Sequence, residues 1–315
     1  MSLFLIHTFL LQCLSSSDYV GTVFGFGKIR AQLFKTIKLV YLENIMDIIY
    51  LNHSAFYVKL ENKNILIDYG SMPKRPLNGR LNKGIFDFSI YKSKTNLIGY
   101  SSHRHADHFD ENLIKQFLQN KIPYILSDET AFSIETYMQD SNFYRILPNS
   151  LWEIEGLKIA NTGSTDQGGS ILFQEQSANY SIYYGADLAV WDDFPEFYEG
   201  FSKEFNWLSE VKDQFAPVKV AFLPSGTGDG YQEDPLLDGA MQMINLLKPD
   251  LVIPMHGANY PEYYPGFVTA MQKRFGKTKI DTGTFNKYDE NMIIDKKFQL
   301  YYPEKPGDMI QINMK

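Results

Sequence analysis

The sequence has little of what several classes of protein require. Its single cysteine, Cys13, excludes an internal disulfide and a cysteine-rich metal site, so we expect a reducing, cytoplasmic environment. No hydrophobic run reaches the length of a membrane span, so we expect no membrane partner. Basic residues are not in excess, because 30 Lys and Arg stand against 37 Asp and Glu and give a net charge of -7. This charge disfavours a nucleic-acid partner.

The residues that are present suffice for one large domain. The 315 residues are 44% hydrophobic and 21% charged, which is ample material for a core. The segment 1–45 fits poorly, because it begins apolar without the basic residues of a secretory signal and then loses any clear period. We interpret 1–45 as a doubtful leader, due either to a start codon assigned too far upstream, which we favour, or to a signal-like segment. We expect 46–315 to form one domain.

From Met46 onward, strand patterns alternate with helix patterns in two rounds. The strand patterns cover 48–51, 55–60, 64–67, 97–100, 144–147, 151–154, 157–160, 170–173, 180–184, 218–223 and 251–254. The helix patterns begin near Asp110 and Ser127 and also cover 191–206, 234–247 and 265–275. This order suggests two sheets packed face to face with helices outside.

The histidines are few but clustered. Three of the 6 lie within Ser102-His103-Arg104-His105-Ala106-Asp107-His108, directly after a predicted strand. Imidazole and carboxylate are the ligands that zinc prefers. In an extended loop, His103 and His105 point the same way and could bind one ion, whereas Asp107 and His108 could face a second. A plain polar loop is the alternative, which we disfavour because a buried strand leads into the segment.

This HxHxDH segment resembles the signature of the metallo-β-lactamase fold superfamily. Other segments resemble that superfamily as well, and the resemblance covers nearly all of the chain from Met46 onward. They are the opening hairpin from His53 to Asp68, the strand end Tyr184-Gly185-Ala186-Asp187 and the strand end Pro254-Met255-His256-Gly257. The resemblance implies an α+β fold with a four-layer αββα sandwich.

The resemblance also implies two divalent metal ions. The ligands it implies are His103 and His105 for the first ion, Asp107, His108 and His256 for the second, and Asp187 for both. Zinc is the default metal for such ligands, while manganese or iron would suit a site richer in carboxylates. Asp107 would also orient the attacking hydroxide and thus act in catalysis.

One histidine of the superfamily pattern is missing, because none lies between His108 and His256. The segment in its place is Gly163-Ser164-Thr165-Asp166-Gln167-Gly168-Gly169-Ser170. It resembles a GSTDxGxS version found, with a GADLxxW segment, in a subgroup of uncharacterised members, and Gly185–Trp191 matches that second segment. Asp166 would then replace the histidine as a ligand. The alternative is that Asp166 caps a turn and the first site has one ligand fewer.

His53 lies on the first hairpin and, by the resemblance, near the metals. There it could donate to substrate or to a metal-bound carboxylate. A plain core or surface histidine is the alternative.

Together these residues predict a metal-dependent hydrolase. Two cations about 3.5–4 Å apart would share a hydroxide that attacks an ester-like carbonyl or a phosphorus. The expected partner is a small-molecule ester, lactone or phosphodiester. Two alternatives stay open, namely a phosphodiesterase that processes RNA or DNA, and a metal-binding scaffold with little turnover. No pattern in the sequence indicates an oligomeric state.

Overall fold

The computed structural model describes most of the chain after residue 44. The described residues are 45–76, 78–91, 96–127, 137, 139–226, 233–257, 263–276, 280–285 and 298–314. They belong to one compact unit, Ile45–Lys315. The leader, apart from Ile45, and the helix predicted to begin near Ser127 lie outside the described residues. Within the described ranges, no helix has the length and apolar character needed to cross a membrane.

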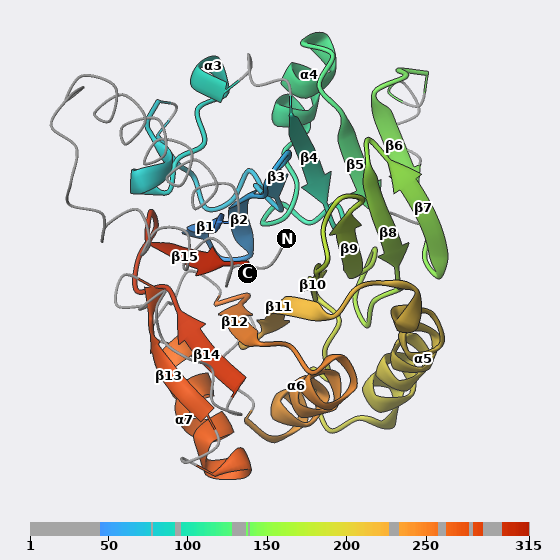
Figure 1. Ribbon diagram of the computed structural model, residues 1–315, viewed down its shortest axis with the longest axis vertical. Coiled ribbons are helices and arrows are strands. Elements are labelled where there is room, and N and C mark those ends of the chain that lie inside the picture. Colours follow the sequence, from blue (N-terminus) through green and yellow to red (C-terminus); the bar gives the residue numbers. More distant parts are fainter. Residues whose placement is uncertain are drawn as a thin grey trace, which may run out of the picture. The chain divides into compact units, whose positions relative to one another are not determined.

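Two β-sheets form the centre of this unit (Figure 1). As far as the chain is described, the first sheet has the order β15-β1-β2-β3-β4-β5-β6. Its strands are β1 (Ile45–Asn52), β2 (Ala55–Lys59), β3 (Asn64–Ile67), β4 (Leu97–Ser101), β5 (Tyr124–Ser127), β6 (Phe143–Ile146) and β15 (Met309–Asn313).

The second sheet has the order β13-β14-β12-β11-β10-β9-β8-β7 over the same described ranges. Its strands are β7 (Ser150–Ile154), β8 (Leu157–Asn161), β9 (Ile171–Glu175), β10 (Ser181–Tyr184), β11 (Val218–Pro224), β12 (Leu251–Met255), β13 (Ile280–Thr284) and β14 (Phe298–Tyr302). Strands β10, β11 and β12 are parallel neighbours, so their carboxyl ends lie along one edge.

Helices cover the outer faces of both sheets (Figure 1). The helices are α3 (Phe88–Tyr91) and α4 (Glu111–Gln119) on the first sheet, and α5 (Pro195–Val211), α6 (Glu233–Leu247) and α7 (Tyr263–Phe275) on the second. Two short 3-10 turns lie at Leu81–Lys83 and Lys212–Gln214. A separate core lies between the sheets, where the rings of Phe56 and Phe222 are 4.7 Å apart. The predicted four-layer αββα sandwich is therefore confirmed.

Local sequence explains where the helices begin. The Asp110 carboxylate accepts hydrogen bonds from the backbone N–H groups of Asn112 and Leu113, so it caps α4 as predicted. The helix expected from residue 191 begins only at Pro195, because proline is favoured in the first turn, where its missing N–H costs nothing. Before Pro195, Trp191 instead contacts the site, as described below.

The strands near the C-terminus were not predicted. Strand β15 pairs antiparallel with β1, and Met46 lies opposite Ile312. Its burial alternates along the strand, with Ile310 and Ile312 inside, so a period of two was present in the sequence. The short runs around β13 and β14 depend on pairing with β12, which is distant in sequence.

Candidate metal centre

Two groups of potential metal ligands lie at the ends of these strands. The first group consists of His103, His105, Asp166 and Asp187, and the second of His53, Asp107, His108 and His256. Within each group the ligand atoms lie within 4.8 Å of one another. Every site residue named in the sequence analysis therefore belongs to one of the two groups.

The first group joins the HxHxDH loop after β4 to the Asp166 segment. The Nδ1 atom of His105 lies 3.1 Å from Asp166 Oδ2 and 3.1 Å from Nε2 of His103. His103 is fully buried, whereas the side chains of His105 and Asp166 are 45% and 37% exposed. Asp166 thus stands beside the two histidines of its group.

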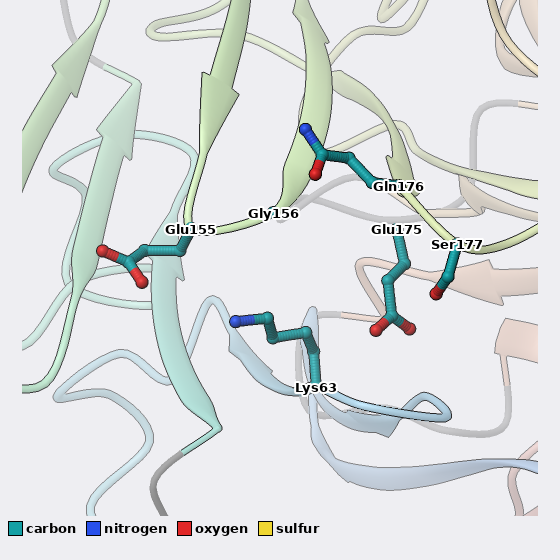
Figure 2. Close-up of a pocket in the computed structure, with 6 residues that line it drawn as sticks. All are labelled: Lys63, Glu155, Gly156, Glu175, Gln176 and Ser177. Carbon is teal, nitrogen blue, oxygen red and sulfur yellow. The ribbon is translucent and has the colours of Figure 1, made fainter.

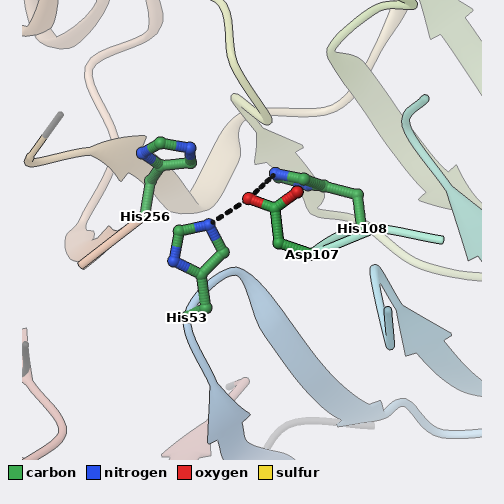
Figure 3. A group of neighbouring side chains, drawn as sticks. All are labelled: His53, Asp107, His108 and His256. Atoms are coloured by element: carbon green, nitrogen blue, oxygen red, sulfur yellow. Dashed lines mark ion pairs between the residues drawn. The ribbon is translucent and has the colours of Figure 1, made fainter. Parts of the chain in front are cut away.

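The second group joins the first hairpin, the HxHxDH loop and the end of β12 (Figure 3). Asp107 Oδ2 lies 3.0 Å from His53 Nε2 and 3.6 Å from His108 Nε2. The rings of His53 and His256 have centroids 4.4 Å apart. The structure therefore places His53 among the potential ligands, in contact with the carboxylate of Asp107.

Asp187 faces both groups. Its Oδ2 lies 3.5 Å from Nε2 of His103 and 3.5 Å from Nε2 of His256, and its Oδ1 lies 3.4 Å from Nε2 of His108. The carboxylate is buried in the turn after β10, where Ala186 has a φ of 45°. A single side chain thus reaches ligand atoms of both groups.

The donor set fits a divalent cation. Asp187 Oδ1 and His108 Nε2 are buried and form no hydrogen bond. Buried polar atoms of this kind are rare in folded proteins, because an unpaired group loses its interaction with water. A cation between the two groups would satisfy both atoms, and imidazole with carboxylate suits zinc, manganese or iron.

Asp68 contacts a histidine of the second group, a contact that the sequence analysis missed. This fully buried carboxylate accepts hydrogen bonds from the backbone N–H and the hydroxyl of Ser102, each 2.7 Å long, and from the Tyr184 hydroxyl at 2.6 Å. It also lies 2.7 Å from Nδ1 of His108. This contact fixes the ring and leaves Nε2 directed at Asp187. The signal available in the sequence was an aspartate at the end of a buried strand.

Electrostatics in the site favour positive charge on two of its buried histidines. Burial alone would lower the pKa of His108, but the carboxylates of Asp187 and Asp68 outweigh it and raise that pKa to about 10. Burial likewise opposes the charged form of His256, yet Asp187 raises its pKa. His53 and His103 differ, because burial lowers the pKa of both, and that of His53 falls to about 4. The potential that stabilises an imidazolium would also stabilise a metal ion.

The two motifs of the subgroup contact each other. Thr165 Oγ1 lies 2.6 Å from the carbonyl oxygen of Ala189 and accepts a 3.0 Å hydrogen bond from the Ala189 N–H. The indole N–H of Trp191 donates to the Asp187 carbonyl at 3.2 Å. The GSTD segment therefore holds the backbone that carries Asp187.

The glycine pair of the GSTDQGGS segment packs against the HxHxDH loop. Gly168 has a φ of 65°, and a Cβ atom there would lie 1.9 Å from the carbonyl oxygen of Ser102. The Gly169 N–H donates to the same oxygen at 3.3 Å. The segment can approach Ser102, and hence the metal ligands, because it has no side chain at this point.

Gly168→Ala should therefore weaken both folding and metal binding. The clash and the positive φ should lower the free energy of unfolding by about 1–3 kcal/mol. Chemical denaturation and metal analysis of the purified variant would measure both effects. Gly266→Ala is the matched control, since that glycine lies within α7 with no atom near its Cβ position; it should stabilise the protein by about 0.5–1 kcal/mol. Unchanged stability in Gly168→Ala would contradict the packing argument.

A separate hollow lies at the other end of β2 from His53 (Figure 2). It has a volume of about 530 Å³ and is lined by Lys63, Glu155, Gly156, Glu175, Gln176 and Ser177. It is built from chain reversals that follow β2, β7 and β9 and contains no histidine. This hollow is therefore not part of the metal centre.

Two sequence comparisons found similar proteins. Residues 47–199 match the model of a family described as beta-lactamase superfamily domain. A protein of Ignicoccus hospitalis named UPF0173 metal-dependent hydrolase is 27% identical over 227 residues, which cover 67% of this chain and 82% of that protein.

Two solved structures with the same fold are described as enzymes with different chemistry. Igni18, described as a novel metallo hydrolase from the hyperthermophilic archaeon Ignicoccus hospitalis, matches with a TM-score of 0.55 and 18% identity over 86% of this chain and 100% of its own. CmlA, a diiron β-hydroxylase from Streptomyces venezuelae, matches with a TM-score of 0.51 and 12% identity over 86% of this chain and 54% of its own. At these identities the likeness concerns the fold.

Proposed function

We propose that this chain is a metal-dependent hydrolase of the metallo-β-lactamase superfamily and that it hydrolyses a small-molecule ester, lactone or phosphodiester at the two His and Asp groups. The observation that carries the proposal is the position of Asp187, whose two oxygens face histidines of both groups at 3.4–3.5 Å. A carboxylate in this position is suited to bind two cations at once, as a binuclear hydrolase requires.

We assign the ligands of the two ions from the same contacts. The proposed ligands are His103, His105, Asp166 and Asp187 for the first ion, and Asp107, His108, His256 and Asp187 for the second. When bound, two divalent ions would supply a hydroxide nucleophile at neutral pH and polarise the bond to be cleaved. Zinc is our first choice, and the two carboxylates of the first group also suit manganese or iron.

Asp107 is the proposed catalytic carboxylate. Its side chain is 38% exposed, while Asp187 is buried, so Asp107 is the second-group carboxylate that substrate and water can reach. Burial opposes its ionisation, but the contact with His53 and the charge of His108 hold the pKa of Asp107 well below its usual range. Ionised, its Oδ2 can accept and orient the proton of the attacking water.

His53 acts through Asp107 in this proposal. Its side chain is only 3% exposed, which leaves little surface for substrate. With a pKa of about 4 the ring is neutral and can direct an N–H at Asp107 Oδ2, 3.0 Å away. We therefore favour the positioning of a metal-bound carboxylate over direct substrate binding.

The rival functions make different predictions. A nuclease would need surface to bind phosphates, and the net charge of -7 disfavours it. A scaffold would bind metal without turnover.

Metal analysis of the native protein, combined with hydrolysis of 4-nitrophenyl esters, lactones and bis(4-nitrophenyl) phosphate, separates the three functions. We expect two equivalents of metal and hydrolysis of at least one probe. One equivalent with no turnover would overturn the proposal in favour of the scaffold. We also propose a cytoplasmic location, because a chain with a single cysteine fits a reducing compartment.

Asp166→His should change the metal preference. A histidine in place of this carboxylate removes one negative charge from the first group, and an imidazole-richer site favours zinc over manganese. We expect two bound metals and a higher zinc-to-manganese affinity ratio, measured by competition in metal-free buffer. The control is Asp193→His, which adds a histidine on an exposed residue outside both groups. If Asp166→His leaves the metal preference unchanged and Asp166→Ala retains its full metal content, Asp166 is not a ligand and only stabilises a turn.

A further inference from the structure

Arg75 is a cation beside the metal centre that the proposed mechanism does not use. It lies in the loop that follows β3, and its Nη1 donates a 2.7 Å hydrogen bond to the carbonyl oxygen of Gly70. Its guanidinium lies over the ring of Tyr69, 4.2 Å from the centroid. Met72 and Lys74 in the same loop are exposed, so the guanidinium lies just beneath the surface of the loop.

Two of its nitrogens have no partner. The Nε and Nη2 atoms of Arg75 are buried and form no hydrogen bond. Arg75 takes part in no ion pair among the residues that the structure describes. The carboxylate that acts on it electrostatically is that of Asp110, which already caps α4. A buried charge with unused donors is costly unless an anion pairs with it.

The loop connects Arg75 directly to the site. A Cβ atom on Gly70 would lie 2.3 Å from the carbonyl carbon of Asp107, so the backbones of the two loops touch. The charge of Arg75 also acts on the hydroxyl of Tyr50, which accepts a 2.9 Å hydrogen bond from the backbone N–H of His53. Arg75 is therefore bonded to a residue that touches the backbone of Asp107, and its charge acts on the residue that holds the backbone of His53.

We infer that Arg75 forms an anion subsite of the metal centre, and that the natural substrate carries a carboxylate or phosphate group in addition to the bond that is hydrolysed. A planar guanidinium with two adjacent free N–H groups matches the paired oxygens of such an anion. This inference rests on the proposed function and narrows its substrate class to anionic molecules.

The kinetic test uses two esters with the same leaving group. The probes are 4-nitrophenyl butyrate, which is neutral, and mono-4-nitrophenyl glutarate, which bears a terminal carboxylate. In Arg75→Gln we expect kcat/KM for the glutarate ester to fall at least about 10-fold relative to the butyrate ester, mainly through KM, because a hydrogen bond to a charged group is lost. Arg75→Lys should recover part of the loss. The control Lys74→Gln removes an exposed charge from the same loop and should leave the ratio unchanged.

A binding measurement decides the inference separately from turnover. Glutarate and glycerol 2-phosphate are titrated calorimetrically into the metal-loaded native protein and into Arg75→Gln, with metal content and melting temperature measured for both. Weaker binding of either anion to Arg75→Gln, at equal metal content, supports the subsite, and the anion more affected identifies carboxylate or phosphate. The inference would be overturned if both proteins bound the anions equally, or if kcat/KM fell equally for both esters in Arg75→Gln. Arg75 would then be a residue that only holds the loop. Failure to hydrolyse any probe would count against the proposed function alone.

Discussion

Asp187→Asn should cost the protein most of its bound metal and its activity. Asp187 contacts ligand atoms of both groups, so its loss removes a ligand from each proposed ion and leaves the repulsion between two cations unscreened. Residues that only orient metal ligands already contribute about 10–100-fold to metal affinity. We expect a loss of at least that size here, with fewer than one equivalent of metal retained after dialysis. Metal analysis and isothermal titration with zinc would measure it.

Asp166→Asn is the matched comparison. It makes the same change in charge on a carboxylate that contacts only the first group. We expect it to weaken one ion and spare the other, so that about one equivalent of metal remains. If both variants lose both ions equally, the assignment of Asp187 as the residue that binds both ions is wrong. The fold of each variant is checked by its thermal melt without metal.

Asp68→Asn should have the second-largest effect, because it should lower both the free energy of unfolding and the affinity for metal. The native carboxylate accepts from Ser102 and Tyr184 and pairs with His108 in a fully buried position. An amide brings two N–H donors into a place where the neighbours already donate. Breaking a buried charged pair in this way costs about 3–5 kcal/mol of unfolding free energy. Metal affinity should fall about 10–100-fold, since His108 loses its orientation.

Asp47→Asn is the control for this change. Asp47 is also a buried carboxylate of the first sheet, but it pairs with the half-exposed Lys59 and accepts from Gln311 at the start of β1. Its loss should cost no more than about 1 kcal/mol and leave metal affinity unchanged. Denaturation without metal and zinc titration of both variants complete the comparison. A stable Asp68→Asn protein with native zinc affinity would remove Asp68 from the metal centre.

Sequence by itself indicated which residues could bind a metal. The three histidines and the aspartate of the HxHxDH segment are residue types that bind metals, and their spacing is typical of metal ligands. Such a local pattern can be recognised without knowledge of the fold. The alternation of strand and helix patterns likewise predicted a two-sheet sandwich, because burial on one face leaves a period in the sequence. The superfamily resemblance, now supported by the family match, added the distant Asp187 and His256.

Only the tertiary structure decided how these residues meet. Asp166 lies 3.1 Å from His105 because Gly168 lets its segment approach the backbone of Ser102, which no local pattern could predict. The contact of His53 with Asp107, the network around Asp68 and the unpaired nitrogens of Arg75 also arise between segments distant in sequence. Local sequence encodes residue type and periodicity, whereas burial and partners depend on which strands and loops pack together. Strand β15 shows the same limit, since its place beside β1 joins the two ends of the described chain.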